Sequence, residues 1–187
     1  MIFVDDATGA AIHEEAGPSS HETALDTPEA ASAPSSGSFV LTVHGLPEPK
    51  ARPRAAVVGG RARLYTPSKT ARYEDRVRKT ALRDWRHDPL RGAAITLVAA
   101  FYLSIPESWP AWRRDAATAG AIVPTGRPDL DNLVKAILDG MNGTVYLDDS
   151  AIVSKRVEKR YDSRPRVEIA LLWRSMPATR AEWEATR

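Results

Sequence analysis

The stretch "RPDLDNLVKAILDG" at residues 127–140 combines the apolar spacing of a helix with a high density of charged side chains. Its apolar residues recur at intervals of three and four, which predicts a helix over residues 129–141. The apolar stripe of this helix consists of Leu130, Leu133, Val134, Ile137, Leu138 and Met141. The charged residues that accompany it are Asp129, Asp131, Lys135 and Asp139.

Strand-like segments lie on both sides of this helix. Runs of alternating β-branched residues, or of continuous apolar residues, predict strands where turn residues bound them. These runs are 38–46, 93–103, 143–147, 151–160 and 166–173. A further pair of short extended runs flanks Gly59 and Gly60 within residues 55–65, which predicts a β-hairpin.

A second long helix is predicted to begin at Thr66-Pro67 and to run to about Trp85. Thr66 is a good N-cap residue, and proline is tolerated at the first helical position. A connector rich in Pro and Trp, with room for a short helix, follows the run at 93–103. Strands before, between and after the helices predict an α/β (α+β) fold with a mixed β-sheet packed with two main helices.

Charge divides the chain into an acidic beginning and a basic body. Residues 1–37 hold seven acids and neither Lys nor Arg, so residues 38–187 carry 26 bases against 17 acids, a net charge of about +9. Residues 1–37 are also rich in Ala, Ser, Pro and Gly, and we expect a disordered acidic tail there. This tail is either a solvated extension, a mis-assigned start included, or a competitor of nucleic acid for the basic body. We expect the folded domain at 38–175 and a C-terminal extension at 176–187.

Composition excludes several classes of protein. No apolar run approaches the roughly 20 residues that span a bilayer. The absence of cysteine excludes disulfides, thiolate zinc sites and a cysteine nucleophile. The first residues lack the positive segment and apolar core of a secretory signal. We therefore expect a cytoplasmic protein that does not associate with membranes.

Cations gather on one face of the helix expected at 67–85 and in the segment before it. The apolar residues of this helix are spaced four apart and are Tyr73, Val77, Ala81 and Trp85. Nearly opposite them lie Arg72, Arg76, Lys79, Arg83 and Arg86. The preceding loop and hairpin add Lys50, Arg52, Arg54, Arg61 and Arg63. A row of cations on one helix is often only a solvated face, but the loop and helix together favour DNA as the partner, because such cations pair with phosphate oxygens.

The acids of the 129–141 helix have two interpretations. As the N-cap, Asp129 would accept backbone N–H groups, and the helix dipole would favour Asp131 in the first turn. This interpretation does not account for Asp139, which lies further along the same polar face. The stretch "YLDDS" at 146–150 then returns two more acids toward the helix.

Carboxylates that gather in this way repel one another unless a cation joins them. Hard oxygen ligands suit Mg²⁺, and a metal held by carboxylates in a basic protein favours attack on a phosphodiester. Lys135, one helical turn after Asp131, could offset charge on the phosphate during the reaction. Alternatively, Lys135 could form only a salt bridge with Asp131 or Asp139.

The stretch "RPDLDNLVKAILDGMNGTVYLDDSAIV" at 127–153 resembles the signature of the RusA-type Holliday-junction resolvases, also described as crossover junction endodeoxyribonucleases. "GLPEPKARPR" at 45–54 and "YTPSKTARYED" at 65–75 are similar to phage and prophage members of that family. The resemblance covers about residues 39–173. It implies a homodimeric, Mg²⁺-dependent endonuclease with an α/β fold, which nicks opposing strands of a four-way junction in DNA recombination and repair.

The resemblance also implies roles for particular residues. Asp129, Asp131 and Asp149 correspond to the acidic, metal-binding triad, and Lys135 corresponds to the catalytic lysine. Mg²⁺ is the expected cofactor, with Mn²⁺ able to substitute. Asp148 is the weaker candidate of its pair, and Asp139 is expected to support the site rather than to bind the metal.

Other functions stay open on the sequence alone. A glycosyltransferase with an Asp-x-Asp motif would also use a metal, but it usually needs a larger nucleotide-binding fold. A non-catalytic module that binds branched DNA would keep the basic face and use its acids only as helix caps. A nuclease that acts on flaps or on other branched DNA is a third alternative.

Overall fold

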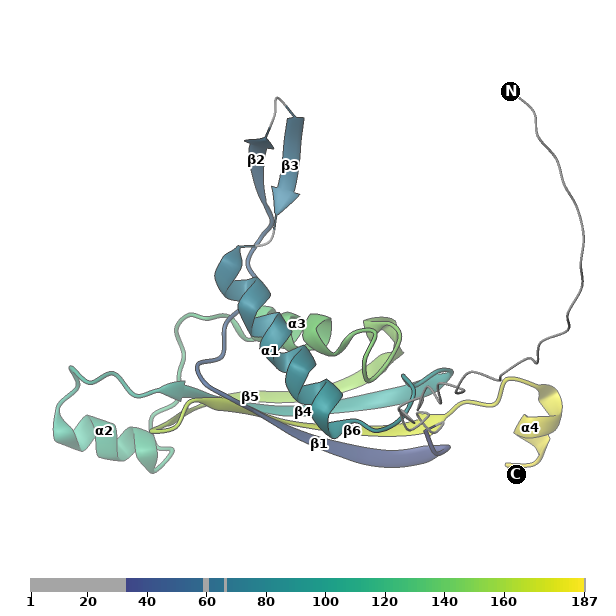
Figure 1. The fold of residues 1–187 in the computed structure, drawn as a ribbon. Helices are drawn as coiled ribbons and strands as arrows, with labels where there is room; N and C mark the ends of the chain where they lie inside the picture. Colours follow the sequence, from purple (N-terminus) through teal and green to yellow (C-terminus); the bar gives the residue numbers. More distant parts are fainter. Residues whose placement is uncertain (1–32, 59–60, 66, 187) are drawn as a thin grey trace, which may run out of the picture.

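The computed structural model describes residues 33–58, 61–65 and 67–186 (Figure 1). The strands are β1 (Ser36–His44), β2 (Arg54–Val58), β3 (Arg61–Tyr65), β4 (Ala93–Ser104), β5 (Ile152–Asp162) and β6 (Arg166–Ser175). The helices are α1 (Ser68–Asp84), α2 (Ala111–Thr118), α3 (Leu130–Met141), the short 3₁₀ helix η1 (Asp149–Ala151) and α4 (Arg180–Glu184). Residues 1–32, which make up most of the predicted acidic tail, lie outside the described residues, and β1 begins at Ser36.

Four strands form a mixed sheet in the order β1-β6-β4-β5. β6 is antiparallel to both β1 and β4, whereas β4 and β5 are parallel. Parallel neighbours cannot be joined by a tight turn, and the connection between β4 and β5 contains α2, α3 and η1. The predicted α/β (α+β) class with a mixed sheet is confirmed.

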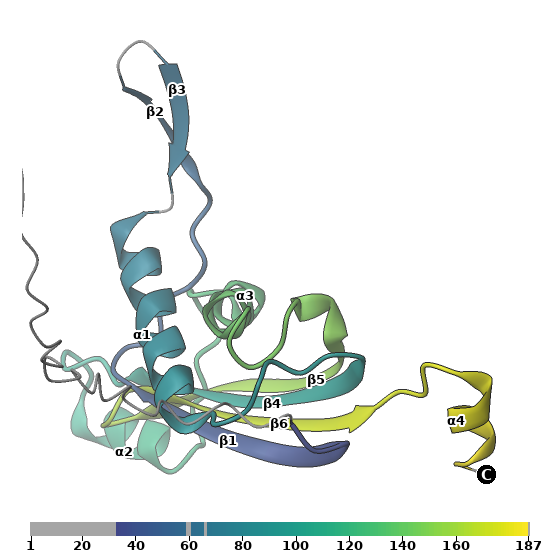
Figure 2. The same ribbon diagram turned by 45° about the vertical axis from the view of Figure 1, so that its right-hand side comes forward.

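Helices α1 and α3 cover one face of this sheet, which we call the helix-covered face (Figures 1 and 2). Alternate side chains of β4 point into the core on this face, and Ile95, Leu97 and Phe101 are fully buried. The predicted apolar stripe of α1 is buried, and so is most of the stripe of α3. The core therefore lies between the two helices and the sheet.

Gly140 lets α3 approach α1 closely. A Cβ atom at this position would lie 2.7 Å from Cβ of Val77 and 2.9 Å from the backbone oxygen of Glu74. The backbone of α3 therefore rests directly on α1, and this contact fixes the position of Asp139 beside α1.

The predicted hairpin is present as the antiparallel pair β2 and β3, which projects beyond the N-terminal end of α1 (Figures 1 and 2). Its turn residues Gly59 and Gly60 lie outside the described residues, as does Thr66. The prediction that Pro67 is the first residue of α1 was wrong, because its ψ of 142° is extended and Pro67 stands at the cap position. In the C-terminal extension expected at 176–187, the structure contains α4.

The segment 143–147, predicted to be a strand, forms a tight loop instead. The backbone N–H groups of Thr144 and Val145 bond to the carbonyl oxygen of Met141, and Gly143 has a φ of 72°. Two of the apolar residues that suggested a strand, Val145 and Tyr146, are fully buried in the core as part of this loop, whereas Leu147 is exposed. The backbone groups of this segment bond to the end of α3, within the loop and to Leu90, rather than to a strand of the sheet.

In the part of the chain that the structure describes, no helix is both long enough and apolar enough to pass through a bilayer.

Candidate active site

The N-terminal end of α3 presents two exposed carboxylates. Asp129 occupies the N-cap position and Asp131 lies in the first turn, but the side chain of Asp129 makes no capping hydrogen bond. Among the described residues, neither carboxylate has a hydrogen bond or an ion pair. The capping role that the sequence allowed for the Asp129 side chain is therefore absent, and both groups are available to ligands.

The two adjacent acids after the loop have different tasks. Asp148 is the N-cap of η1, and its Oδ1 accepts a hydrogen bond of 2.9 Å from the backbone N–H of Ser150. Asp149 begins η1, and its Oδ2 accepts a hydrogen bond of 2.6 Å from Nζ of Lys135. The cap at Asp148 orients the short helix, and the next residue consequently faces α3.

A cavity of about 290 Å³ lies between α3, η1 and β5. Its lining consists of Asp131, Val134, Lys135, Leu138, Asp149, Lys155 and Val157. The structure thus brings together three of the four residues that the sequence placed in the catalytic centre, while Asp129 lies outside the lining. The analysis of the sequence missed Lys155, because that residue lay in a run interpreted only as a strand.

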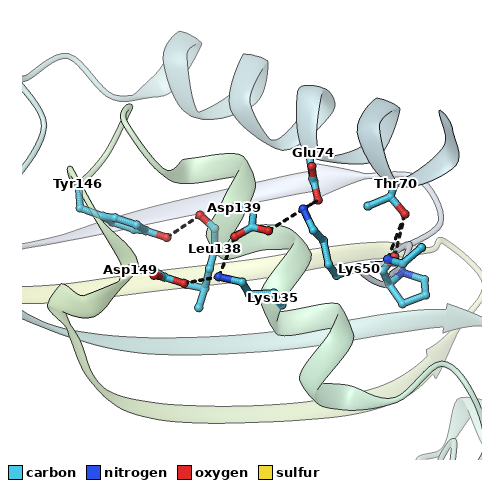
Figure 3. Close-up of polar contacts among 10 residues, drawn as sticks. Lys50, Thr70, Glu74, Lys135, Leu138, Asp139, Tyr146 and Asp149 are labelled. Atoms are coloured by element: carbon cyan, nitrogen blue, oxygen red, sulfur yellow. Dashed lines mark hydrogen bonds and ion pairs between the residues drawn. The ribbon is translucent and has the colours of Figure 1, made fainter. Parts of the chain in front are cut away.

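Lys135 is held between two carboxylates, as Figure 3 shows. Its Nζ lies 2.6 Å from Oδ2 of Asp149 and 2.9 Å from Oδ1 of Asp139. Hydrogen bonds to Asp149 and Asp139 raise the pKa of the Lys135 ammonium well above its ordinary value. The two contacts favour the protonated form of Lys135 and give its ammonium a defined position.

Asp139 joins Lys135 to a second lysine. Oδ2 of Asp139 lies 2.7 Å from Nζ of Lys50, and the same ammonium lies 2.6 Å from Oε1 of Glu74 on α1 (Figure 3). Burial alone would raise the pKa of Asp139, but hydrogen bonds from Lys50 and Lys135 leave that pKa below its ordinary value. An alternating chain of charges therefore runs from α1 through α3 to Asp149.

The loop that carries Lys50 is tied to both helices by its backbone. The backbone N–H of Lys50 donates to the carbonyl oxygen of Asn132 on α3 over 2.8 Å. The hydroxyl of Thr70 on α1 donates to the carbonyl oxygen of Pro49 and accepts from the backbone N–H of Ala51 (Figure 3). The sequence placed Lys50 on a DNA phosphate, whereas in this structure its ammonium contacts two carboxylates.

The cations predicted to bind DNA on the α1 side are exposed. They are Arg72, Arg76, Lys79, Arg83 and Arg86. Acids of the same helix partly neutralise this row, because Lys79 pairs with Asp75 and Arg83 pairs with Asp84. Arg52 and Arg61 are also exposed, whereas the side chains of Arg54 and Arg63 are outside the description.

The donor atoms around the cavity suit a hard divalent cation, although they do not form a large cluster. Within the described ranges, no group of three or more His, Cys, Asp or Glu residues is arranged to hold a metal ion. Mg²⁺ typically uses one or two protein carboxylates and completes its shell with water and substrate phosphate. Asp131 and Asp149, which share the cavity lining, meet that smaller requirement.

Comparison with known proteins identifies the class to which this fold and site belong. Residues 44–172 match the family described as endodeoxyribonuclease RusA. The chain is also similar to the uncharacterized protein YqaN of Bacillus subtilis (strain 168), with 30% identity over 133 residues that cover 70% of this chain and 93% of that protein. The chain therefore belongs to the RusA family of endodeoxyribonucleases.

Membership of this family confirms the resemblance that the sequence showed. It identifies the chain as an enzyme that hydrolyses phosphodiester bonds of DNA, in the class of the Holliday junction resolvases. Branched DNA is the substrate class of this family. The matched residues extend from the end of β1 into β6, so they include the whole of the candidate active site.

Proposed function

We propose that the protein is a Mg²⁺-dependent homodimer that resolves four-way DNA junctions by paired symmetric nicks in recombination and repair. The observation that carries this proposal is the cavity lined by Asp131, Lys135 and Asp149 in a chain of the RusA family. Asp131 and Lys135 come from α3, which is packed into the core, and Asp149 comes from η1, whose N-cap is Asp148. A positioned pair of acids beside a cation suits metal-assisted hydrolysis of a phosphodiester.

Different residues would bind the metal ion and stabilise the negative charge on the phosphate. Asp131 and Asp149 would hold Mg²⁺, with Asp129 exposed at the same end of α3 as a third carboxylate. Bound there, Mg²⁺ would polarise a phosphoryl oxygen and stabilise the leaving oxygen. Lys135 would offset the negative charge that develops on the phosphate, because Asp139 keeps its ammonium in place.

Hydrolysis joins the oxygen of water to phosphorus and breaks one phosphorus–oxygen ester bond, and the leaving oxygen takes up a proton. Two strands must be cut to resolve a junction, and each chain contributes one such cavity. A two-fold symmetric dimer would therefore place one cavity at each of two symmetry-related phosphodiesters. The exposed cations of α1 would bind the backbone of the junction arms.

A cleavage assay with four DNA substrates tests this function. Labelled four-way junction, flap, linear duplex and single-stranded DNA are each incubated with the protein in Mg²⁺ or in EDTA. We expect paired nicks in the four-way junction with Mg²⁺ and none in EDTA. Preferential cutting of the flap would show that the protein is a flap nuclease rather than a junction resolvase. Cutting in EDTA would contradict the role of the metal.

A further inference from the structure

Lys155 is a cation in the lining of the active-site cavity, and the proposed function gives it no role. Its side chain is exposed and lines the cavity together with Asp131, Lys135 and Asp149. Among the described residues it has no hydrogen bond and no ion pair. Lys135, by contrast, already contacts two carboxylates within 2.9 Å.

A β-bulge near the start of β5 explains how Lys155 reaches this cavity. Ile95 of β4 lies opposite Ile152, but the next residue, Thr96, lies opposite Ser154. Val153 is therefore an extra residue in β5, and this residue is 66% exposed. Because side chains of a strand alternate between faces, one extra residue moves every later side chain of that strand to the other face.

The bulge thus reverses the orientation of Lys155. With the bulge, Lys155 lies opposite Leu97, which is fully buried on the helix-covered face. Without it, the continuing register would place Lys155 opposite Val98 on the other face of the sheet. Bulges are common beside active sites, where they redirect a side chain, and this bulge follows η1 directly.

The later side chains on this face of β5 contact the core and the segment that leads into α3. Val157 packs against the core beneath α3. Nζ of Lys159 donates to the carbonyl oxygens of Gly126 and Pro128 over 2.8 and 3.0 Å, in the loop that leads into Asp129. One lysine of β5 therefore positions the segment before α3, while Lys155 remains available in the cavity.

Electrostatics favour an anion as the partner of Lys155. A phosphodiester that enters the cavity meets the negative charges of Asp131 and Asp149. Two of the three N–H donors of Lys135 are already directed at Asp139 and Asp149, whereas among the described residues none of the three donors of Lys155 has a partner. Charge-assisted hydrogen bonds to phosphate oxygens are among the strong ones.

We propose that Lys155, turned into the cavity by the bulge at Val153, is a catalytic residue that donates a hydrogen bond to a non-bridging oxygen of the scissile phosphodiester. This inference rests on the proposed nuclease function and adds a second cation to the site. The proton stays on Lys155 throughout, because its role is to stabilise the charge that builds up on the phosphoryl oxygens.

Single-turnover cleavage of a pre-bound four-way junction in Mg²⁺ tests this role. Lys155→Ala should lower the rate constant by about a hundredfold, the order expected for the loss of one preorganised donor to a transition-state oxyanion. Arg156→Ala is the matched control, because it removes the same charge from the next residue of β5, which lies opposite Val98 on the other face. The control should retain the wild-type rate constant, and both variants should retain the wild-type melting temperature.

The outcomes separate this inference from the proposed function. An unchanged rate constant in Lys155→Ala, or an equal loss in Arg156→Ala, would overturn the contact with the phosphate. A loss of junction affinity in EDTA as large as the loss of rate would show a binding residue and overturn the catalytic role. A wild-type protein that cuts none of the four DNA substrates would instead refute the nuclease proposal, and the role of Lys155 with it.

Discussion

The acids of α3 differ in their surroundings, although they share one sequence motif. Asp131 is exposed and has no partner among the described residues, whereas Asp139 is partly buried and contacts two lysines. A carboxylate without a protein partner is free to bind a cation. A carboxylate between two ammonium groups is better suited to hold those groups in place. We therefore assign metal binding to Asp131 and the support of Lys135 to Asp139.

Replacing Asp131 by Asn tests the metal site. We expect Asp131→Asn to abolish nicking of a four-way junction in Mg²⁺, because the amide removes a charged oxygen ligand. Junction binding in a gel-shift assay should stay intact or become tighter, since one negative charge less faces the phosphate. Asp115→Asn, which makes the same change at an exposed position on α2, should leave cleavage unchanged. An Asp131→Asn protein that cuts at the wild-type rate would refute the assignment.

Replacing Lys135 by Ala separates catalysis from structure. If Lys135 stabilises charge in the transition state, Lys135→Ala should lower the turnover rate by orders of magnitude with little change in the Kd of the junction. If Lys135 is only the salt-bridge partner of Asp139, the variant should lose at most about 0.5 kcal/mol of stability and keep its rate. Single-turnover kinetics on pre-bound junction, together with thermal unfolding, distinguish the two results.

At the scale of elements, the close contact between α1 and α3 sets the geometry of the site. Gly140→Ala should destabilise the protein, because the new methyl group would overlap Val77 and the backbone of Glu74, and such overpacking costs about 1–3 kcal/mol. This loss should exceed the gain of about 1 kcal/mol that alanine brings to a helix interior. Gly126→Ala is the control, since its Cβ would meet no atom within 4 Å. Chemical denaturation measures both variants, and a more stable Gly140→Ala protein would contradict the close packing.

The exposed face of α1 provides a second test at this scale. The double variant Arg76→Ala with Arg83→Ala should weaken junction binding and leave the melting temperature nearly unchanged, because both side chains are exposed and the hydrogen bond from Arg76 to the carbonyl oxygen of His44 is long, at 3.3 Å. The slope of log affinity against log salt should fall by about two, at near 0.9 for each lost phosphate contact. A matched pair of exposed arginines elsewhere, Arg91 and Arg174, should leave the slope unchanged when replaced by Ala.

An unchanged slope in the variant of α1 would show that this face is merely solvated. The short ion pairs within the helix make this a genuine alternative, since Arg83 already contacts Asp84 at 2.6 Å. In that case we expect the DNA to lie along the loop before the hairpin and the hairpin itself, where Arg52 and Arg61 are exposed.

For the whole molecule, the proposed reaction requires two copies of the chain. Each chain has one cavity with Asp131, Lys135 and Asp149, and two symmetric nicks need two such cavities. Light scattering at micromolar protein concentration should therefore give the mass of a dimer, which is twice the 20.5 kDa of the chain. A monomeric mass combined with full junction-resolving activity would contradict this expectation.

Local patterns in the sequence determined most of the elements and much of the candidate site. The apolar spacing around Leu133 and Ile137 predicted α3, because a helix can bury only residues that recur every three or four positions. The same spacing placed Lys135 one turn from Asp131, independently of how the rest of the chain packs. The predicted strand at 143–147 was wrong, because burial of a short apolar run does not reveal where its backbone bonds go.

The packing of these elements brings together residues that lie far apart in the sequence. The contact of Lys50 with Glu74 and Asp139 depends on the packing of α1 against α3, and no local pattern encodes it. The orientation of Lys155 depends on one extra residue opposite β4, in a strand that carries cations on both faces. A period of two cannot reveal which face is inward when polar residues occupy both, so pairing with the neighbouring strand determined that Lys155 faces the active site.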